Sequence, residues 1–169
     1  HARGQVFSFD APNRYPPCSV RNALNANLPV DIAVLEIIEV AADFHARYTA
    51  KRKEYSYAIY SADVRPVLTN DFVWFYPHQL TLDTMAEVAS AFVGRRDYRA
   101  FTTEAGRMEN CVRTIEYATV TKIQEVFAIR VCADGFLYNL VRAIAGCVAE
   151  AGRGKFDAKR VQYFLSSGE

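Results

Sequence analysis

The sequence predicts an α+β fold in which helices pack on one face of an antiparallel sheet. Apolar and polar residues alternate strictly over residues 53–62, which is the period of a strand. Two alternating runs rich in β-branched residues within 115–134 predict a β-hairpin, and apolar residues at helical spacing over 82–93 and 136–151 predict two helices. Strands that lead into helices and back, with antiparallel pairs between them, are typical of this layered fold.

The first third of the chain predicts two strands and one helix. Residues 5–9 alternate in the period of a half-buried strand, and the apolar run at 32–40 predicts a second strand. Between them, three prolines and an asparagine predict a loop over 10–17, and a short helix is expected over 19–27. Because the first strand has no turn or cap signal ahead of it, we expect it to belong to a longer chain.

The middle of the chain predicts a strand, a helix and a tight turn. The short apolar run at 71–76 is expected to be a third strand. Thr81 is the expected N-cap of the helix over 82–93, and Gly94 is its stop signal. The turn of the hairpin is expected at 124–125, between the two alternating runs.

Two helices are predicted near the end of the chain. The first, over 136–151, is expected to end at Gly152, and the second is expected to begin after an N-cap at Asp157. Between residues 137 and 149, only three residues carry polar groups: Tyr138, Asn139 and Arg142. Because apolar residues surround this helix on nearly every side, we expect it to be buried.

Composition places the chain among ordinary globular proteins. It has 169 residues, of which 51% are hydrophobic and 23% charged, so it can form one domain with a core of its own. No apolar run approaches the length that crosses a membrane, and the composition is not that of a disordered chain. We therefore expect a folded protein with no membrane partner.

Cysteines and histidines give no sign of a metal site. The cysteines are scattered without CxxC spacing: Cys18, Cys111, Cys132 and Cys147. His45 and His78 lack metal-ligand spacing, and there is no glycine-rich phosphate loop. We therefore expect no metal, and we expect the cysteines to be small buried residues in a reducing intracellular compartment, with the cytoplasm as the first choice. A disulfide framework is the alternative.

The net charge is only +1, but the charges are segregated along the chain. Residues 30–44 hold four acidic side chains and no basic one, whereas later segments hold basic clusters: 47–53, 95–99 and 153–160. Such segregation can build a positive face for phosphate, and Arg95 and Arg96 are candidate residues of that face. The alternative is that these charges lie in solvated loops and at helix ends.

A basic and aromatic segment leads into the strictly alternating strand. Three basic residues come first: Lys51, Arg52 and Lys53. Alternating tyrosines follow, and Tyr55 and Tyr57 share one face of the strand. Cations on phosphates and rings stacked on bases are how a sheet binds single-stranded RNA, so these residues are candidates for RNA binding. The alternative is that the tyrosines only pack in the core.

Arg142 is the most informative residue of the long helix. A guanidinium cannot give up its charge, and burying it alone is prohibitively costly, so Arg142 needs a carboxylate partner. Tyr138 and Gly146 lie one turn to either side, and the glycine leaves room for another chain segment. We expect a segment to dock against Arg142; a purely structural ion pair is the alternative.

Four motifs, which occur along the chain in the same order as in the family, resemble those of one enzyme family. FLYNLVRAIAGCVAEAGRGK at 136–155 resembles the signature helix of the tRNA pseudouridine synthase A (TruA) family, and FHARYTAKRKEYSYAIY at 44–60 resembles its basic and aromatic strand entry. RDYRAFTT at 96–103, with CVRTI at 111–115, resembles its middle segments. HARGQV at 1–6 is similar to the end of its catalytic loop, GRTDAGVHA followed by GQV.

The resemblance implies a reaction, in which a uridine in the anticodon stem-loop of tRNA is isomerised to pseudouridine without metal or organic cofactor. In the family an aspartate attacks or deprotonates the ribose, and the uracil detaches, rotates and rejoins through C5. This aspartate belongs to GRTD, four residues before the position of His1. We therefore expect His1, Gly4 and Gln5 to be a remnant of the catalytic loop, and the isolated chain to be inactive.

The resemblance also implies roles for two residues of this chain. Arg142 is expected to pair with the catalytic aspartate and to hold it ionised and oriented. Tyr55 matches the active-site tyrosine, which stacks on or hydrogen-bonds the target base. Asn139 and Ala143 depart from the pattern, because the family more often has histidine and asparagine there.

The family's fold implies two α/β halves, each similar to a ferredoxin-like or RNA-recognition-motif unit. Residues 1–45 are then a remnant of the N-terminal half, and 46–169 are the C-terminal catalytic half, incomplete at its end. The family forms homodimers, so we expect the full-length protein to form one. Two alternatives stay open: a non-catalytic RNA-binding module whose sheet stacks bases, and a protein-interaction domain.

Overall fold

The structure, a computed structural model, describes residues 2, 4–11 and 14–168. The chain divides into two units, His1–Ala50 and Lys51–Glu169. Every strand in the described residues belongs to the second unit.

The first unit contains the helix α1 (Pro17–Asn27), which confirms the helix expected over 19–27. Proline suits the start of a helix because the first backbone N–H groups have no partner within the helix. Asn25 ties the following chain to this helix. Its side-chain nitrogen donates to the Val34 carbonyl at 2.9 Å, and its side-chain oxygen accepts from the Val34 N–H at 2.7 Å.

The strands predicted at 5–9 and 32–40 are wrong, because neither segment forms a strand in the described part of the chain. Alternation provides an apolar face, but a strand forms only when a neighbour takes its backbone hydrogen bonds. No described residue of this unit is paired with either segment in a ladder. Their apolar side chains are largely exposed, as Val6, Phe7 and Ile38 illustrate.

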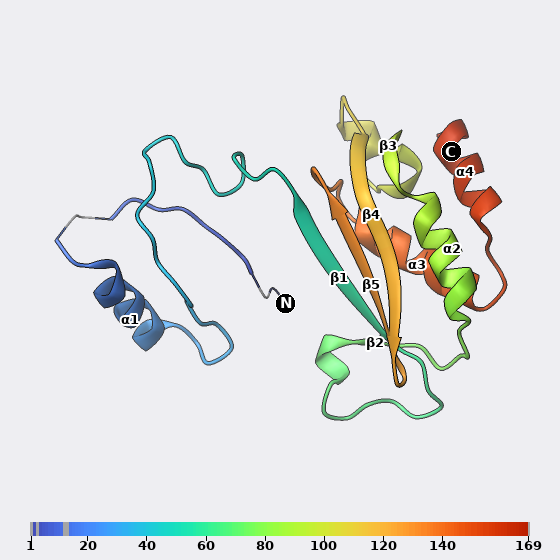
Figure 1. Cartoon of the computed structure of the whole chain (residues 1–169), viewed down its shortest axis with the longest axis horizontal. Helices are drawn as coiled ribbons and strands as arrows, with labels where there is room; N and C mark the ends of the chain where they lie inside the picture. Colours follow the sequence, from blue (N-terminus) through green and yellow to red (C-terminus); the bar gives the residue numbers. More distant parts are fainter. Residues whose placement is uncertain (1, 3, 12–13, 169) are drawn as a thin grey trace. The chain divides into compact units, whose positions relative to one another are not determined.

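The second unit is built on a five-stranded sheet of order β2-β1-β5-β4-β3 (Figure 1). Its strands are β1 (Lys53–Tyr60), β2 (Trp74–Phe75), β3 (Gly94–Asp97), β4 (Val112–Ile123) and β5 (Val126–Ala133). The pair β1·β2 is parallel, and all the other pairs are antiparallel. The strictly alternating segment therefore lies inside the sheet, between β2 and β5.

β4 and β5 form the predicted hairpin, with Gln124 and Glu125 in its turn. Gln124 has a φ of 53°, the left-handed conformation that tight hairpin turns use. The register between the two strands shifts between Ile115 and Tyr117, which marks an irregularity near the start of β4. This irregularity lies at the sheet end where β1 begins, because Ile115 and Lys53 both pair with Ala133.

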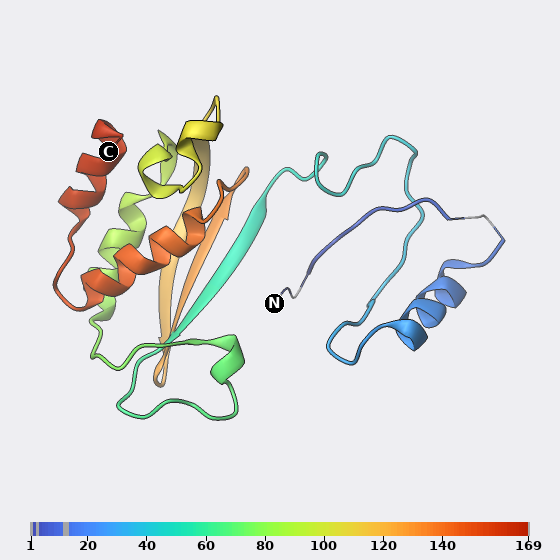
Figure 2. The same ribbon diagram turned by 180° about the vertical axis from the view of Figure 1, so that it is seen from behind.

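Three helices cover one face of the sheet, as Figures 1 and 2 show from opposite sides: α2 (Leu82–Ala91), α3 (Leu140–Gly152) and α4 (Ala158–Ser167). Three single 3-10 turns complete this unit: η1 (Asn70–Phe72) lies between β1 and β2, and η2 (Arg99–Phe101) and η3 (Ala105–Arg107) lie between β3 and β4. Asp157 caps α4 as predicted, because its carboxylate accepts from the Arg160 N–H at 2.8 Å. The α+β prediction, with helices on one face of a mainly antiparallel sheet, is thus confirmed.

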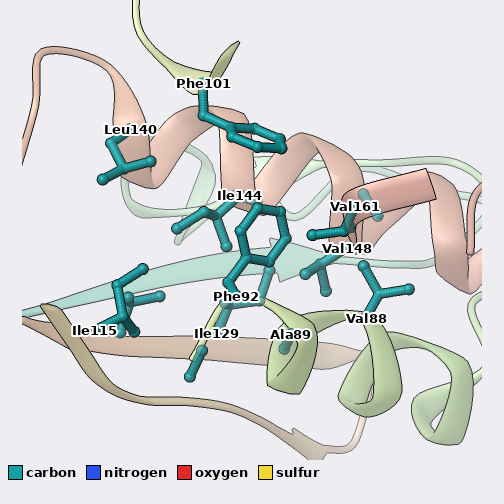
Figure 3. Packing of buried hydrophobic residues seen from close by; sticks show 14 of the residues in the cluster. Val88, Ala89, Phe92, Phe101, Ile115, Ile129, Leu140, Ile144, Val148 and Val161 are labelled. Atoms are coloured by element: carbon teal, nitrogen blue, oxygen red, sulfur yellow. The ribbon is translucent and has the colours of Figure 1, made fainter. Parts of the chain in front are cut away.

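The core lies between the sheet and the helices (Figure 3). Leu140, Ile144 and Val148 of α3 repeat every four residues and are fully buried, so they form one stripe that faces the sheet. Ile115 and Ile129 meet this stripe from β4 and β5. Burying each such side chain contributes roughly 1.5–3 kcal/mol, so this stripe fixes how α3 sits on the sheet.

α3 begins at Leu140, four residues later than the helix predicted over 136–151. The reason is Asn139, whose φ of 61° is left-handed and cannot belong to a continuous right-handed helix. Asparagine is one of the few residues that adopt this conformation at modest cost. The apolar spacing did not indicate this later start, because Phe136 and Leu137 continue the apolar pattern of the helix.

Candidate active site

The start of α3 is tied to the segment that follows η2. The Thr102 hydroxyl donates to the Tyr138 carbonyl at 2.9 Å, and the Asn139 side-chain nitrogen contacts the Thr103 hydroxyl oxygen at 3.4 Å. The Asn139 carbonyl in turn accepts the helical hydrogen bond from Ala143 at 3.0 Å. These bonds determine where the first turn of α3 begins.

Arg142 lies on this first turn and is exposed, so the prediction that it is buried is wrong. Two residues along an α-helix correspond to a rotation of about 200°, and Leu140 faces the core, so Arg142 faces away from it. Arg142 lines an open depression of about 400 Å³ together with Thr102, Thr103 and Asn139. The residues that hold the start of α3 are therefore also the polar neighbours of Arg142.

Arg142 has no carboxylate partner within the described residues: no acidic oxygen lies within 4.0 Å of its guanidinium. The other polar side chains of the depression are two hydroxyls and one amide, and none carries a charge. Arginine stays protonated and offers a planar set of donors that matches a carboxylate or a phosphate. The depression can therefore bind an anionic group against Arg142.

Tyr55 lies on β1, and 51% of its surface is exposed. Its ring meets the Phe136 ring edge to face, with centroids 5.0 Å apart. Phe136 belongs to the connection between β5 and α3, which also carries Asn139. Tyr55 and Arg142 thus border the two ends of the same short connection, and no hydrogen bond joins them among the described residues.

The basic residues at the start of β1 and just before it differ in their surroundings. Arg52 forms an ion pair of 3.2 Å with Glu116 on β4, although both side chains are substantially exposed. Lys51 and Lys53 form no ion pair within the part of the chain that the structure describes. Two of the three candidate cations are therefore available to a polyanion without breaking a local pair.

A polar cluster on the open face of the sheet was not anticipated from the sequence. The Tyr117 hydroxyl donates to the Glu54 carboxylate, and this bond is the main cause that raises the pKa of Tyr117 to about 12. Arg130 lies 3.7 Å from the other Glu54 oxygen. The strand register brings these residues together, and no local motif could have indicated them.

Three of the predicted site residues belong to the first unit. His1 lies outside the described residues. Gly4 and Gln5 are described and exposed, and they belong to no helix or strand. Their assignment to a catalytic loop stays a prediction.

Neither a metal cluster nor a membrane-spanning helix occurs among the described residues. No group of three or more histidine, cysteine, aspartate or glutamate side chains there could hold a metal ion. No helix within the described ranges is both long enough and apolar enough to cross a membrane.

Comparison with known proteins places these residues in a family. The family model described as tRNA pseudouridine synthase matches residues 88–169, which contain Thr102, Asn139 and Arg142. The chain is 37% identical to tRNA pseudouridine synthase A of Clostridium kluyveri over 167 residues, covering 99% of this chain and 68% of that protein. This chain belongs to the tRNA pseudouridine synthase A family. The resemblance of the four motifs is thereby confirmed.

Other members of the tRNA pseudouridine synthase A family match over the same extent. The protein of that name from Moorella thermoacetica is 39% identical over 99% of this chain and 68% of its own length. tRNA pseudouridine synthase A 2 of Clostridium perfringens is 36% identical over 100% of this chain and 69% of its own length. These matches include Tyr55, which lies outside the segment matched by the family model.

Proposed function

We propose that this chain provides part of the active site of a synthase that isomerises uridine to pseudouridine in the anticodon stem-loop of tRNA. The single observation that carries the proposal is the exposed guanidinium of Arg142, which lies in a depression of neutral polar side chains and has no carboxylate partner among the described residues. Membership of the tRNA pseudouridine synthase A family supports the reaction type. The proposed chemistry uses no metal and no organic cofactor.

Arg142 has the properties needed to hold a catalytic aspartate. An adjacent guanidinium favours the ionised form of a carboxylate, and its planar donors orient both carboxylate oxygens. The depression is open, so the aspartate can reach Arg142 from another segment. In this proposal the aspartate belongs to a GRTD segment, as in the family pattern, and Arg142 keeps it charged and aimed at the ribose.

Tyr55 is proposed to contact the target base. Its half-exposed ring offers a surface on which a base can stack, and stacking on aromatic side chains is worth about 1–3 kcal/mol per base. The Phe136 and Tyr55 rings pack edge to face, and this contact limits the orientations of the Tyr55 ring. The phosphates are proposed to lie against Lys51, Arg52 and Lys53, with Arg95 and Arg96 as further contacts.

We propose that the 169 residues alone do not catalyse the reaction. None of the described aspartates is paired with Arg142, so the group that starts the chemistry has to come from elsewhere. In this scheme residues 1–45 belong to an N-terminal half and 46–169 to the C-terminal catalytic half, and the full-length protein forms a homodimer. The synthase is thus assembled from this chain and a GRTD segment.

The test is tritium release from C5-labelled uridine in tRNA. It compares the chain with a version that carries GRTDAGV fused before His1. We expect turnover only with the fused segment, and we expect Arg142→Met in that background to abolish turnover while Arg142→Lys restores little of it, because a lysine lacks the planar fork. Full activity of the chain without the segment would contradict the proposed need for the aspartate.

A non-catalytic RNA-binding module is the second candidate. It is favoured by the half-exposed Tyr55 and by Lys51 and Lys53, which form no ion pair with any residue that the structure describes. The choice of RNA distinguishes the two candidates. A synthase prefers a folded tRNA stem-loop, whereas a stacking module binds any unpaired strand of equal length. Binding of both RNAs with equal affinity, without turnover by the fused chain, would favour the module.

A further inference from the structure

The pairing of β4 and β5 ends at a rung that a side chain completes. Ile115 pairs with Ala133, so Thr114 and Asp134 are the next residues opposite each other. The Asp134 N–H donates to the Thr114 carbonyl at 3.1 Å. The Thr114 N–H donates in return to the side-chain Oδ1 of Asp134 at 3.0 Å. In a regular antiparallel pair the backbone carbonyl of Asp134 would accept this second bond, so the carboxylate replaces that carbonyl.

This change of acceptor lets the chain leave the sheet at Asp134. A strand continues when the backbone supplies both the donor and the acceptor of each rung. Here the side chain supplies the acceptor, which releases the backbone carbonyl, and β5 ends at Ala133. Asp134 is therefore the first residue of the connection to α3, which comprises residues 134–139.

The contact of Asp134 needs an oxygen and no charge. The side chain is exposed, and no basic nitrogen of the described residues lies within 4.0 Å of its carboxylate. Its hydrogen bond to the Thr114 N–H uses one oxygen atom. An asparagine side chain carries an acceptor oxygen in the same position, so the two residues are interchangeable for this bond.

Arg113 supports the connection directly after Asp134. A Cβ placed on Gly135 would lie 3.7 Å from the Arg113 Nε, so the chain passes within contact distance of this side chain. The Arg113 Nη1 donates to the carbonyls of Asn110 at 3.2 Å and Val112 at 2.7 Å. Because the guanidinium is held by these carbonyls, it gives the connection a fixed surface to pack on.

The connection joins the two residues of the candidate active site. Phe136, two residues after Asp134, packs edge to face against the Tyr55 ring, with centroids 5.0 Å apart. α3 follows the connection and carries Arg142 on its first turn. The hydrogen bond of the Thr102 hydroxyl holds the far end of the connection. A segment that is fixed at both ends therefore determines the surroundings of Tyr55 and the start of α3.

We propose that Asp134 is a positioning residue for the isomerisation. By completing the last rung with its side chain, it sets the path of residues 134–139. This path places Phe136 against Tyr55 and sets the direction from which Arg142 meets the aspartate. Asp134 transfers no proton in this scheme, so an uncharged acceptor can replace it. The inference rests on the proposed function, because the isomerisation is the reaction that it serves.

The first test is tritium release by the chain fused to GRTDAGV, at saturating and at limiting tRNA. Asp134→Ala removes the acceptor and is expected to lower kcat about tenfold with little change in KM, because small displacements of catalytic groups are costly. Asp134→Asn keeps an acceptor oxygen and is expected to keep most of kcat. An unchanged kcat in Asp134→Ala would overturn the proposal. Equal losses in the two variants would also overturn it, because they would assign the role to the charge.

Asp157→Ala is the matched control for a loss of stability. Asp157 also uses its carboxylate to accept a backbone N–H, that of Arg160 at 2.8 Å, but it caps α4, which follows the opposite end of α3. Both alanine variants are expected to lower the Tm by about 2–4 °C. Only Asp134→Ala is expected to lower kcat. A similar fall of kcat in Asp157→Ala would overturn the proposal, because a general loss of stability would then explain both results.

A measurement without RNA keeps the inference separate from the proposed function. NMR of the 169-residue chain detects the contact between Phe136 and Tyr55 as nuclear Overhauser effects between their ring protons. Asp134→Ala is expected to weaken these signals, whereas Asp134→Asn and Asp157→Ala are expected to keep them. Unchanged signals in Asp134→Ala would overturn the inference. If the fused chain releases no tritium, the proposed function is contradicted, and the ring contact then decides whether Asp134 sets the path of the connection.

Discussion

The Tyr76 hydroxyl donates a hydrogen bond of 2.5 Å to the Glu150 carboxylate and so joins the residue after β2 to the last turn of α3. Arg153 completes the cluster, with its Nη1 at 3.1 Å from the same Glu150 oxygen and 3.2 Å from the Tyr76 hydroxyl. Tyr76 is buried, and its N–H also donates to the Tyr60 carbonyl at 2.9 Å. This cluster fixes the end of α3 opposite to the candidate site.

Removal of the Tyr76 hydroxyl tests how much this cluster contributes to the free energy of unfolding. Tyr76→Phe is expected to lower the free energy of unfolding by about 1–2 kcal/mol, because a hydrogen bond to a charged group is lost while Glu150 can still reach water. Urea denaturation measures the change. Tyr163→Phe is the control, since that side chain is exposed, and it is expected to change the stability by less than about 0.5 kcal/mol.

Glu150 also predicts how stability depends on pH. The Tyr76 hydrogen bond is the main cause that lowers the pKa of Glu150 below its ordinary value of 4.5. A carboxyl group with a lowered pKa in the folded state stabilises the protein above its unfolded pKa and loses this contribution as the pH falls through the folded pKa. Between pH 7 and pH 3, wild type is therefore expected to lose more stability than Tyr76→Phe. Parallel curves for the two proteins would contradict this role of Glu150.

Local patterns predicted those elements whose partners are close in the sequence. The β4–β5 hairpin was predicted because its two runs are separated by only two residues, and α4 because its cap at Asp157 is local. The segments 5–9 and 32–40 have the alternation of a strand, but no strand lies beside them among the described residues. The strands predicted there from the pattern alone were therefore wrong. Alternating apolar residues indicate that a segment could bury one face as a strand. Whether the segment forms a strand depends on a neighbouring strand that takes its backbone hydrogen bonds.

The candidate site was predicted only in part for the same reason. Arg142 stands out in the sequence, but the prediction that it is buried was wrong. The helix begins only after the left-handed Asn139, and its buried stripe starts at Leu140, so Arg142 lies on the opposite side of the helix. Thr102 was missed, since it bonds to Tyr138 across 36 residues of sequence. Asp134 meets Thr114 only through the strand register, which no local pattern encodes.

Substitution by alanine is expected to have opposite effects on stability at Gly152, at the end of α3, and at Gly146, in its middle. A Cβ on Gly152 would lie 2.9 Å from atoms of both Leu80 and Met85, whereas a Cβ on Gly146 meets no atom within 4 Å. Gly152→Ala is expected to cost about 1 kcal/mol, the strain of overpacking being partly offset by higher helix propensity. Gly146→Ala is expected to stabilise by about 0.5–1 kcal/mol. Thermal unfolding of the two variants measures both changes, and equal signs would contradict the close packing at Gly152.

The ion pair between Arg52 and Glu116 predicts that Arg52 contributes less to RNA binding than Lys53 at the start of β1. Lys53→Gln is expected to reduce the salt slope of RNA binding by roughly 0.7–0.9, the contribution of one phosphate. Arg52→Gln is expected to reduce it less, because Arg52 is already paired at 3.2 Å. Glu116→Gln frees Arg52 and is expected to tighten RNA binding. Weaker binding by Glu116→Gln would show that the pair is needed to position Arg52.

Thr102 is expected to act on the reaction by positioning the first turn of α3. Its hydroxyl holds the Tyr138 carbonyl at 2.9 Å, directly before the left-handed Asn139, and Arg142 follows within one turn. In the chain fused to GRTDAGV, Thr102→Val is expected to lower kcat about tenfold with little change in KM, because small displacements of a catalytic group are costly while RNA contacts elsewhere remain. Tritium release under saturating and limiting tRNA separates the two constants.

Two further substitutions separate positioning from direct contact with the substrate. Thr102→Ser keeps the hydroxyl and is expected to restore kcat. Thr103→Val removes only the longer 3.4 Å contact to Asn139, so its effect on kcat is expected to be smaller. A rise in KM with unchanged kcat would mean instead that Thr102 binds the tRNA itself, since the loss of a uniform binding contact weakens the ground state and the transition state equally. A kcat effect that Thr102→Ser reverses places the cause in the hydrogen bonds of the Thr102 hydroxyl, which donates to the Tyr138 carbonyl at 2.9 Å and accepts from the Glu104 N–H at 3.3 Å. Through the shorter of these bonds, Thr102 sets the direction from which Arg142 meets the aspartate.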